Sequence, residues 1–488
     1  MRRRLLKLAL LVASPLLFYV IVANAFLASG LLTRLTNQNP TKFSMSYGRA
    51  LTWWPGKVWV RDFRMSYASW SVAFDLELGE TRADIHLLEL FQRRFHAEDV
   101  RSRAVAWRLQ KKSEPATFGS LRDAAQPGIA GVVPFVFGPR PEPNAPQKKK
   151  KPWSVQLDRV DAVVRELWVL EFRWNGVGRA SGDFEVRPME SYWVGPAELR
   201  LAPGTVTVGR HEVSKAFGGE AVTVITRTPI VRTEKLRMLG GLNVDGHFHG
   251  SIDDLSLARI YGFEGEGQGT LDVEAHVHSG RVSLGTEVNL SLPNVRWVHE
   301  KGVGFEGELT AAFEQQRDEP LTLRSSARGH LLVPGPMVAN VPELEGFVKL
   351  STNDLTAGPR LASFRLAADE IEVPDAAGVK AALKGRVPFV VPLVLGDGRL
   401  TARGLEIRGN TSKVHVELAQ ASMGVTTARG EVELEHGRAT GAVEAHVRAL
   451  GIGVALEQGE PKFHVFTKRG WLEAQRAERH GRQAPGSR

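Results

Sequence analysis

Strict alternation of apolar and polar residues is the main pattern in the chain after residue 153. The segments 271–278, 287–292, 414–418 and 431–435 place valine, leucine or alanine at every second position, between polar side chains. Because side chains alternate between the two faces of a strand, each segment predicts a strand with one apolar and one polar face. Glycine and proline turn signals recur about every ten residues, which is typical of short strands joined by turns.

A mainly β body follows from this pattern, and one face of its sheet is apolar. An apolar face that sheets or helices do not cover marks a binding site or an interface, and acyl chains could cover it. The candidate lining residues are the apolar positions of the alternating segments: Leu271, Val273, Ala275, Val277, Val288, Leu290, Leu292, Val414, Val416, Leu418, Val432 and Leu434.

The N-terminal segment 1–33 predicts a single membrane-spanning helix. Leu8 to Thr33 carries no charge and exceeds the roughly 20 residues that cross a bilayer. Basic residues precede it, which places the N-terminus in the cytoplasm and the body across the membrane. The basic residues are Arg2, Arg3, Arg4 and Lys7.

A cleaved secretory signal is the competing interpretation of this segment. Ala23-Asn24-Ala25 resembles a cleavage site, with cleavage after Ala25. The apolar run continues past that site through Phe26 and Leu27, further than a typical signal sequence of about 7–15 apolar residues. The retained anchor is preferred, and both interpretations deliver the body to the same side.

Four further regions follow the anchor. Residues 34–110 predict an N-terminal β module, and residues 111–152 predict a linker loop because they are rich in proline and end in four lysines. Residues 153–468 predict the long β domain, and residues 469–488 predict a polar, basic tail that forms a frayed helix or is disordered. Within the β module, apolar residues at helical spacing predict one short amphipathic helix. These residues are Ile85, Leu88, Phe91 and Phe95.

Charge and composition exclude several functions. The net charge of +9 comes mostly from the N-terminal basic residues and from Lys148 to Lys151, so the rest of the chain is nearly neutral. A nucleic-acid-binding protein concentrates positive charge on its folded surface, so no nucleic-acid partner is expected. The chain has no cysteine, which excludes disulfides, thiol catalysis and cysteine-based zinc sites.

No catalytic motif is recognisable, so we expect no enzyme activity and no cofactor. The glycine-rich run 265–269 lacks the last glycine of a nucleotide-binding loop and predicts a hairpin turn. His247 and His249, like His276 and His278, have the His-x-His spacing that can chelate a metal on one strand face. Their polar, solvent-facing row is the preferred interpretation, and no metal is predicted.

The order of segments resembles a known family. Arg82 to Phe91 runs into Arg93 to Val100 and Val105 to Leu109, and after the proline-rich break Lys151 to Val160 opens the long β region around Trp153. This order, behind a basic-flanked anchor, resembles the AsmA-like family of Gram-negative envelope proteins, relatives of TamB. The resemblance is clearest over residues 1 to 175.

The resemblance implies a fold and a function. It implies an antiparallel sheet curled into an elongated open groove with an apolar lining, held at the inner membrane with its body in the periplasm. Such bridge-like proteins are thought to conduct phospholipid towards the outer membrane, in its biogenesis or maintenance. The alternative is a structural or assembly factor that contacts other envelope proteins.

Overall fold

The computed structural model describes residues 2–69, 72–111, 153–187, 190–209, 211–230, 235–256, 259, 263–299, 302–315, 320–332, 338–358, 360–375 and 398–483. The contacts divide the chain into two compact units. Unit 1 comprises residues 1–261, 272–283 and 354–357, and unit 2 comprises residues 262–271, 284–353 and 358–488. The predicted linker loop 111–152 lies almost wholly outside the described residues, as do its four lysines.

The prediction of a mainly β protein with few short helices is confirmed. Strands make up 72% of the structure, and the 23 strands of the described residues form one mixed, open sheet. The predicted all-antiparallel sheet is wrong at one pair, because β5 (Arg94–Lys111) and β6 (Ser154–Val169) run parallel. A parallel pair needs a long crossover connection, which the segment between these two strands provides. The elongated, curled shape stays a prediction.

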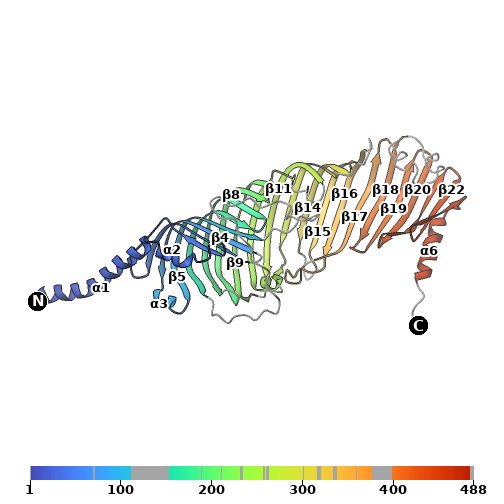
Figure 1. Ribbon diagram of the computed structural model, residues 1–488. Coiled ribbons are helices and arrows are strands. Elements are labelled where there is room, and N and C mark those ends of the chain that lie inside the picture. Colours follow the sequence, from blue (N-terminus) through green and yellow to red (C-terminus); the bar gives the residue numbers. More distant parts are fainter. Residues whose placement is uncertain are drawn as a thin grey trace, which may run out of the picture. The chain divides into compact units, whose positions relative to one another are not determined.

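Unit 1 is a ladder of neighbouring strands (Figure 1). Strands β1 and β2 both pair with β3, and each strand from β3 to β10 then pairs with the next along the chain. Its other elements are α1 (Arg2–Ala28), α2 (Leu31–Thr36), β1 (Phe43–Ser46), β2 (Arg49–Trp54), β3 (Lys57–Ala68), β4 (Val72–Ile85), α3 (Leu87–Leu90), β7 (Phe172–Arg187), β8 (Ser191–Val208), β9 (His211–Pro229), the 3-10 helix η2 (Lys235–Gly241), β10 (Leu242–Ile252) and β12 (Arg281–Val282).

The predicted membrane anchor is not supported by the structure. Among the described residues, no helix combines the length and the apolar character that crossing a bilayer requires. The N-terminal segment does form helix α1, but α1 ends at Ala28 instead of continuing to Thr33. Gly30 adopts a left-handed conformation (φ 69°), which no regular helix accommodates, and α2 begins after it. The side chains of residues 8–13 lie outside the described set.

The short helix predicted around residues 85–95 is reduced to the single turn α3. Strand β4 extends to Ile85 and β5 begins at Arg94, so pairing between these strands takes up both ends of the predicted helix. Leu88 and Phe91 are 80% and 88% exposed, so they form no buried helix face.

A hydrophobic core lies within unit 1. Its buried members are Val105, Ala162, Val164, Trp174 and Leu201. Large half-buried side chains from strands β4 to β10 pack against them, including Leu76, Phe217 and Phe248. The apolar face of this unit is therefore filled in part by its own aromatic residues.

Unit 2 is a second ladder of adjacent strands (Figure 1), in which each strand from β13 to β23 pairs antiparallel with the next. Its strands are β13 (Glu287–His299), β14 (Gly304–Glu314), β15 (Thr322–Leu332), β16 (Val338–Leu350), β17 (Leu361–Val373), β18 (Leu400–Gly409), β19 (Lys413–Met423), β20 (Thr426–Glu435), β21 (Arg438–Val447), β22 (Leu450–Glu457) and β23 (Glu460–Val465). Strand β11 (Phe263–His278) begins in unit 2 and ends in unit 1.

One local prediction is wrong. The glycine-rich run 265–269 lies inside β11, so it does not form the predicted hairpin turn. A Cβ atom at Gly269 would clash with the carbonyl oxygen of Ser291, so glycine here permits close approach of a neighbouring backbone. Of the two alternatives for the tail, a frayed helix or disorder, the described residues form a helix, α6 (Trp471–Gln483), which packs on β21 and β22.

Candidate functional site

An uncharged surface crosses unit 2 from β13 to β22. Directly opposite residues of an antiparallel pair point to the same face, so the register defines continuous rows. The central row consists of Leu290, Ala311, Ser325, Gly346, Leu366, Ile407, Val416, Val432, Gly441 and Leu456. We call this row and its two neighbours the apolar face of unit 2.

The two neighbouring rows are also free of charge. One consists of Val288, Phe313, Leu323, Val348, Phe364, Gly409, Val414, Leu434 and Ala439. The other consists of Leu292, Leu309, Ala327, Leu344, Ala368, Leu405, Leu418, Gly430, Val443 and Val454.

Burial on the apolar face is incomplete. Leu292 and Ala368 are buried, with 1% and 2% of their surface exposed, whereas Leu434 is 40% exposed. Val288, Leu290 and Val416, like most of the rows, are half-buried. A filled protein core buries such side chains almost completely, so this face retains apolar surface that water can reach.

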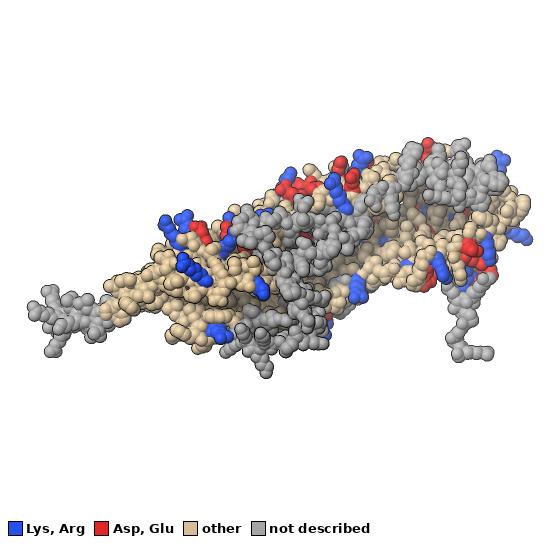
Figure 2. Space-filling view, in the orientation of Figure 1, with Lys and Arg blue, Asp and Glu red and all other residues tan. Residues whose placement is uncertain are grey.

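The opposite face of unit 2 is polar. Arg365 forms an ion pair with Glu406 at 3.1 Å, and Lys413 forms one with Glu433 at 2.7 Å. Basic and acidic side chains are interspersed on the surface visible in Figure 2, without a continuous basic area. This mixture of charges on the visible surface gives no reason to revise the expectation that nucleic acid is not a partner.

Helix α6 lies on the polar face. Arg476 contacts Glu417 at 2.8 Å, Arg479 contacts Glu431 at 2.6 Å, and Glu473 contacts Arg429 at 2.6 Å. These carboxylates and Arg429 alternate with the apolar rows along β19 and β20, so they point to the other side of the sheet. Among the described residues, the helix therefore covers the polar side of unit 2 and not its apolar face.

The predicted groove residues divide between the two units. The register of unit 2 brings eight of them together: Val288, Leu290, Leu292, Val414, Val416, Leu418, Val432 and Leu434. Leu271 also belongs to unit 2, whereas Val273, Ala275 and Val277 belong to unit 1. The alternation did not identify strands β14 to β18, which supply the middle of the apolar face.

A buried ion-pair network lies on the polar face of unit 1, and the sequence did not predict it. The side chain of Asp75 has no exposed surface and contacts Arg108 at 2.7 Å and Arg64 at 3.2 Å. Arg108 also lies 2.6 Å from Glu166, which in turn contacts Arg173 at 2.8 Å. These hydrogen-bonded carboxylates raise the pKa of Arg108 despite the opposing effect of burial.

One member of each histidine pair singled out in the sequence contacts a carboxylate on another strand. His247 Nδ1 lies 2.8 Å from Glu274, and His276 Nδ1 lies 2.8 Å from Asp245. His247 is half exposed, with 56% of its side-chain surface accessible. This placement agrees with the polar, solvent-facing row expected from the alternation.

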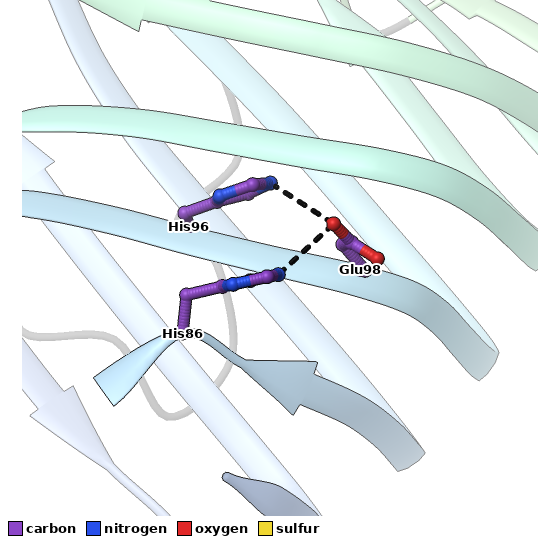
Figure 3. A group of neighbouring side chains, drawn as sticks. All are labelled: His86, His96 and Glu98. Atoms are coloured by element: carbon purple, nitrogen blue, oxygen red, sulfur yellow. Dashed lines mark ion pairs between the residues drawn. The ribbon is translucent and has the colours of Figure 1, made fainter. Parts of the chain in front are cut away.

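A different histidine cluster lies where β4, α3 and β5 meet. The imidazole rings of His86 and His96 stack in parallel, with centroids 4.1 Å apart, and both direct a nitrogen towards Glu98 (Figure 3). The Nε2 atoms of His86 and His96 lie 2.9 Å and 3.7 Å from the same oxygen of Glu98. No local sequence pattern indicates this cluster, because the two histidines are ten positions apart and are brought together by the antiparallel pairing of β4 and β5.

No family model matches the chain, and no curated protein or solved structure is similar to it. The resemblance to the AsmA-like family therefore stays a prediction.

Proposed function

We propose that the protein binds acyl-chain lipid, with phospholipid as the expected class, along the apolar face of unit 2. The supporting observation is the unbroken set of uncharged rows across ten strands, combined with incomplete burial. Transfer of apolar surface out of water stabilises by about 25 cal/mol per Å², so acyl chains on this surface bind favourably. In this proposal the protein conducts phospholipid within the cell envelope and carries out no chemical reaction.

A membrane-held N-terminus is part of the proposal. Helix α1 exposes large apolar side chains, including Leu17, Phe18 and Ile21, which are at least 60% exposed. Trp53 and Trp54, both more than half exposed, belong to β2, which packs against α1. Exposed tryptophan beside an apolar helix is typical of protein at a membrane–water interface. The proposed location is the inner membrane with the body in the periplasm.

Asn24 favours retention of α1 over cleavage after Ala25. Its side-chain amide donates to the carbonyl of Thr52 at 2.7 Å, and its oxygen accepts from the Thr52 amide N–H at 2.9 Å. The Tyr47 hydroxyl donates to the carbonyl of Leu27 at 2.8 Å. Cleavage would remove Asn24 and leave the Thr52 backbone groups without this partner.

The test is lipid analysis of paired variants of the full chain purified in detergent. Leu290→Asp puts a charge on the apolar face, and Asn289→Asp puts the same charge on the polar face of the same strand. We expect copurified phospholipid, measured by mass spectrometry, to fall severalfold in Leu290→Asp and to stay at the wild-type level in Asn289→Asp. Circular dichroism of each variant shows whether it is folded.

Equal lipid content in the wild type and both folded variants would contradict the proposal. Global unfolding of Leu290→Asp, with Asn289→Asp intact, would instead show that the apolar face is a filled core.

A second candidate function is assembly by protein contact. In the described residues β23 pairs with β22 alone, and all six residues of β23 are exposed. Phe463 and Val465 are 44% and 60% exposed. An exposed edge strand can pair with another chain, so this edge favours a protein partner. Absence of lipid, together with a stable protein complex lost in Val465→Pro, would support this alternative.

A further inference from the structure

We propose that His86, His96 and Glu98 bind a divalent transition-metal ion, with Zn²⁺ as the expected class. The three ligand atoms, one from each residue, lie within 4.8 Å of one another. A tetrahedral zinc site with bonds of about 2.0–2.1 Å separates its nitrogen and oxygen ligands by about 3.3 Å. The distances from Glu98 to the two Nε2 atoms, 2.9 Å and 3.7 Å, bracket that separation. The two imidazole rings are stacked in parallel, so binding of one ion requires them to turn towards each other.

The backbone holds the three side chains in place. His96 and Glu98 are two residues apart on β5, so their side chains project from the same face of that strand. His86 directly follows Ile85, the last residue of β4, and its amide N–H donates to the carbonyl of His96 at 3.0 Å. The cluster therefore joins the end of β4 to the start of β5 (Figure 3).

His96 and Glu98 are each oriented by a second partner, as in established metal sites. His96 Nδ1 lies 2.9 Å from Glu89, which leaves its Nε2 atom turned towards Glu98 and Asp158. The other carboxylate oxygen of Glu98 contacts Arg159 at 2.8 Å. A histidine that donates through Nδ1 to a carboxylate presents Nε2 as a metal-binding lone pair.

A fourth donor adjoins the cluster. Asp158 lies opposite Glu98 on the parallel strand β6, and its Oδ2 atom is 2.8 Å from His96 Nε2. Two histidines with two carboxylates form a ligand set that suits zinc better than magnesium or calcium, which prefer oxygen alone. His86 is 41% exposed at its side chain, which provides a path for the ion from solvent.

The expected role of the ion is structural. Asp158 comes from β6, His96 and Glu98 come from β5, and His86 follows the end of β4, so the ion would join three neighbouring segments of the sheet. One of these contacts crosses the parallel β5–β6 pair, whose strands are linked by the long connection between Lys111 and Ser154. A bound ion stabilises the folded form by mass action, because the separate ligands of an unfolded chain bind it weakly.

The experiment uses the full chain, without a polyhistidine tag, after chelation and gel filtration. We expect the wild type to bind one Zn²⁺ per chain, measured by inductively coupled plasma mass spectrometry. We also expect the zinc-bound protein to have a higher Tm than the chelated protein. Co²⁺ as a probe should give the visible absorption of tetrahedral coordination. His86→Gln removes the exposed ligand and should weaken binding at least about tenfold, because even an outer partner of a ligand contributes that much.

Two further variants keep the test decisive. Glu89→Gln removes the carboxylate partner of His96, which also pairs with Arg94 at 3.1 Å, and should weaken Zn²⁺ binding roughly 10–100-fold while the fold is retained. The matched control, His247→Gln with His249→Gln, removes two histidines of the same unit and should leave binding unchanged.

A folded wild type whose Tm and Co²⁺ spectrum do not respond to metal would overturn the proposal, as would undiminished binding by His86→Gln. Loss of binding only in the His247/His249 variant would place the metal elsewhere and overturn it equally.

Discussion

The apolar faces of the two units differ in what fills them. In unit 1, buried residues such as Val164, Trp174 and Leu201 form a cluster, and large neighbours pack against it. In unit 2, the central row, which runs through Leu290 and Val416, contains many small residues and glycines and is mostly half-buried. Both units have an amphipathic sheet, so the strand pattern alone does not decide whether a face becomes a core or a binding surface. Side-chain volume and burial decide it.

The polar faces differ as well. Unit 1 buries a network of charges around Asp75 and Arg108. In unit 2, Glu444 is buried and contacts Arg429 at 2.8 Å, whereas pairs such as Arg365 with Glu406 are more exposed to solvent. A buried pair is sensitive to loss of one partner, and a solvated pair is not. Unit 1 is therefore expected to tolerate substitution less well on both of its faces.

The largest expected effect is a charge in the core of unit 1. Val164 has only 2% of its surface exposed, so Val164→Asp buries a carboxylate. We expect the free energy of unfolding to fall by more than about 4 kcal/mol. The matched control is Val163→Asp, because Val163 is 43% exposed and lies opposite Arg179. Chemical denaturation of the full chain measures both, together with Leu290→Asp, for which we expect under about 2 kcal/mol.

Similar losses in Val164→Asp and Leu290→Asp would contradict the difference between the two apolar faces. A loss confined to Val164→Asp would support it.

The next effect in size concerns the buried charges. Arg108→Met removes the cation between Asp75 and Glu166, whose side chains are 0% and 6% exposed, and should cost about 3–5 kcal/mol. Arg179→Met is the control, because Arg179 pairs with Asp161 at a surface position and should cost less than about 1 kcal/mol. Equal costs in thermal unfolding would show that the network is solvated.

The smallest effect is a pH dependence at His96. Desolvation lowers the pKa of His96, but the hydrogen bonds that its ring donates to Glu89 and Asp158 outweigh it and raise this pKa above its usual value of 6.5. Stability from this histidine is therefore fully present below pH 6.5 and is lost as the pH rises through the folded-state pKa. The groups facing His96 are Glu89, Glu98, Asp158 and His86.

The Tm of the chelated full chain, measured between about pH 6 and pH 8, checks this dependence. His96→Gln should flatten the decline, and His247→Gln should leave it unchanged. Zinc-loaded protein should show the opposite slope, because metal binding requires neutral histidines. A Tm that falls equally in all variants would assign the pH dependence to other groups.

Local alternation predicted the strands that carry it. The segments 271–278, 287–292, 414–418 and 431–435 all lie in strands, and eight of the predicted lining residues share one face. The alternation signal was weaker elsewhere, because bulges shift the register, for example between Leu292 and Val295. Glycines that permit close packing of strands, as at Gly269, were mistaken for turns.

Non-local pairing explains what the sequence could not show. The helix expected around residues 85–95 has the right apolar spacing, but β4 and β5 compete for the same residues and form long strands. His96 meets Asp158 across 62 positions, through a parallel pair that no local pattern indicates. Residues brought together in this way are visible only once the order of strands is known.

The most direct test of the proposed lipid-binding face is photo-crosslinking on a single strand. Ile407 lies on the apolar face of unit 2, and its neighbour Arg408 points to the polar face of β18. The full chain, carrying p-benzoylphenylalanine in place of one or the other residue, is irradiated in native membranes and analysed by mass spectrometry. We predict a lipid adduct at position 407 and none at position 408. Adducts at both positions, at neither, or between position 407 and the chain itself would contradict lipid binding on this face.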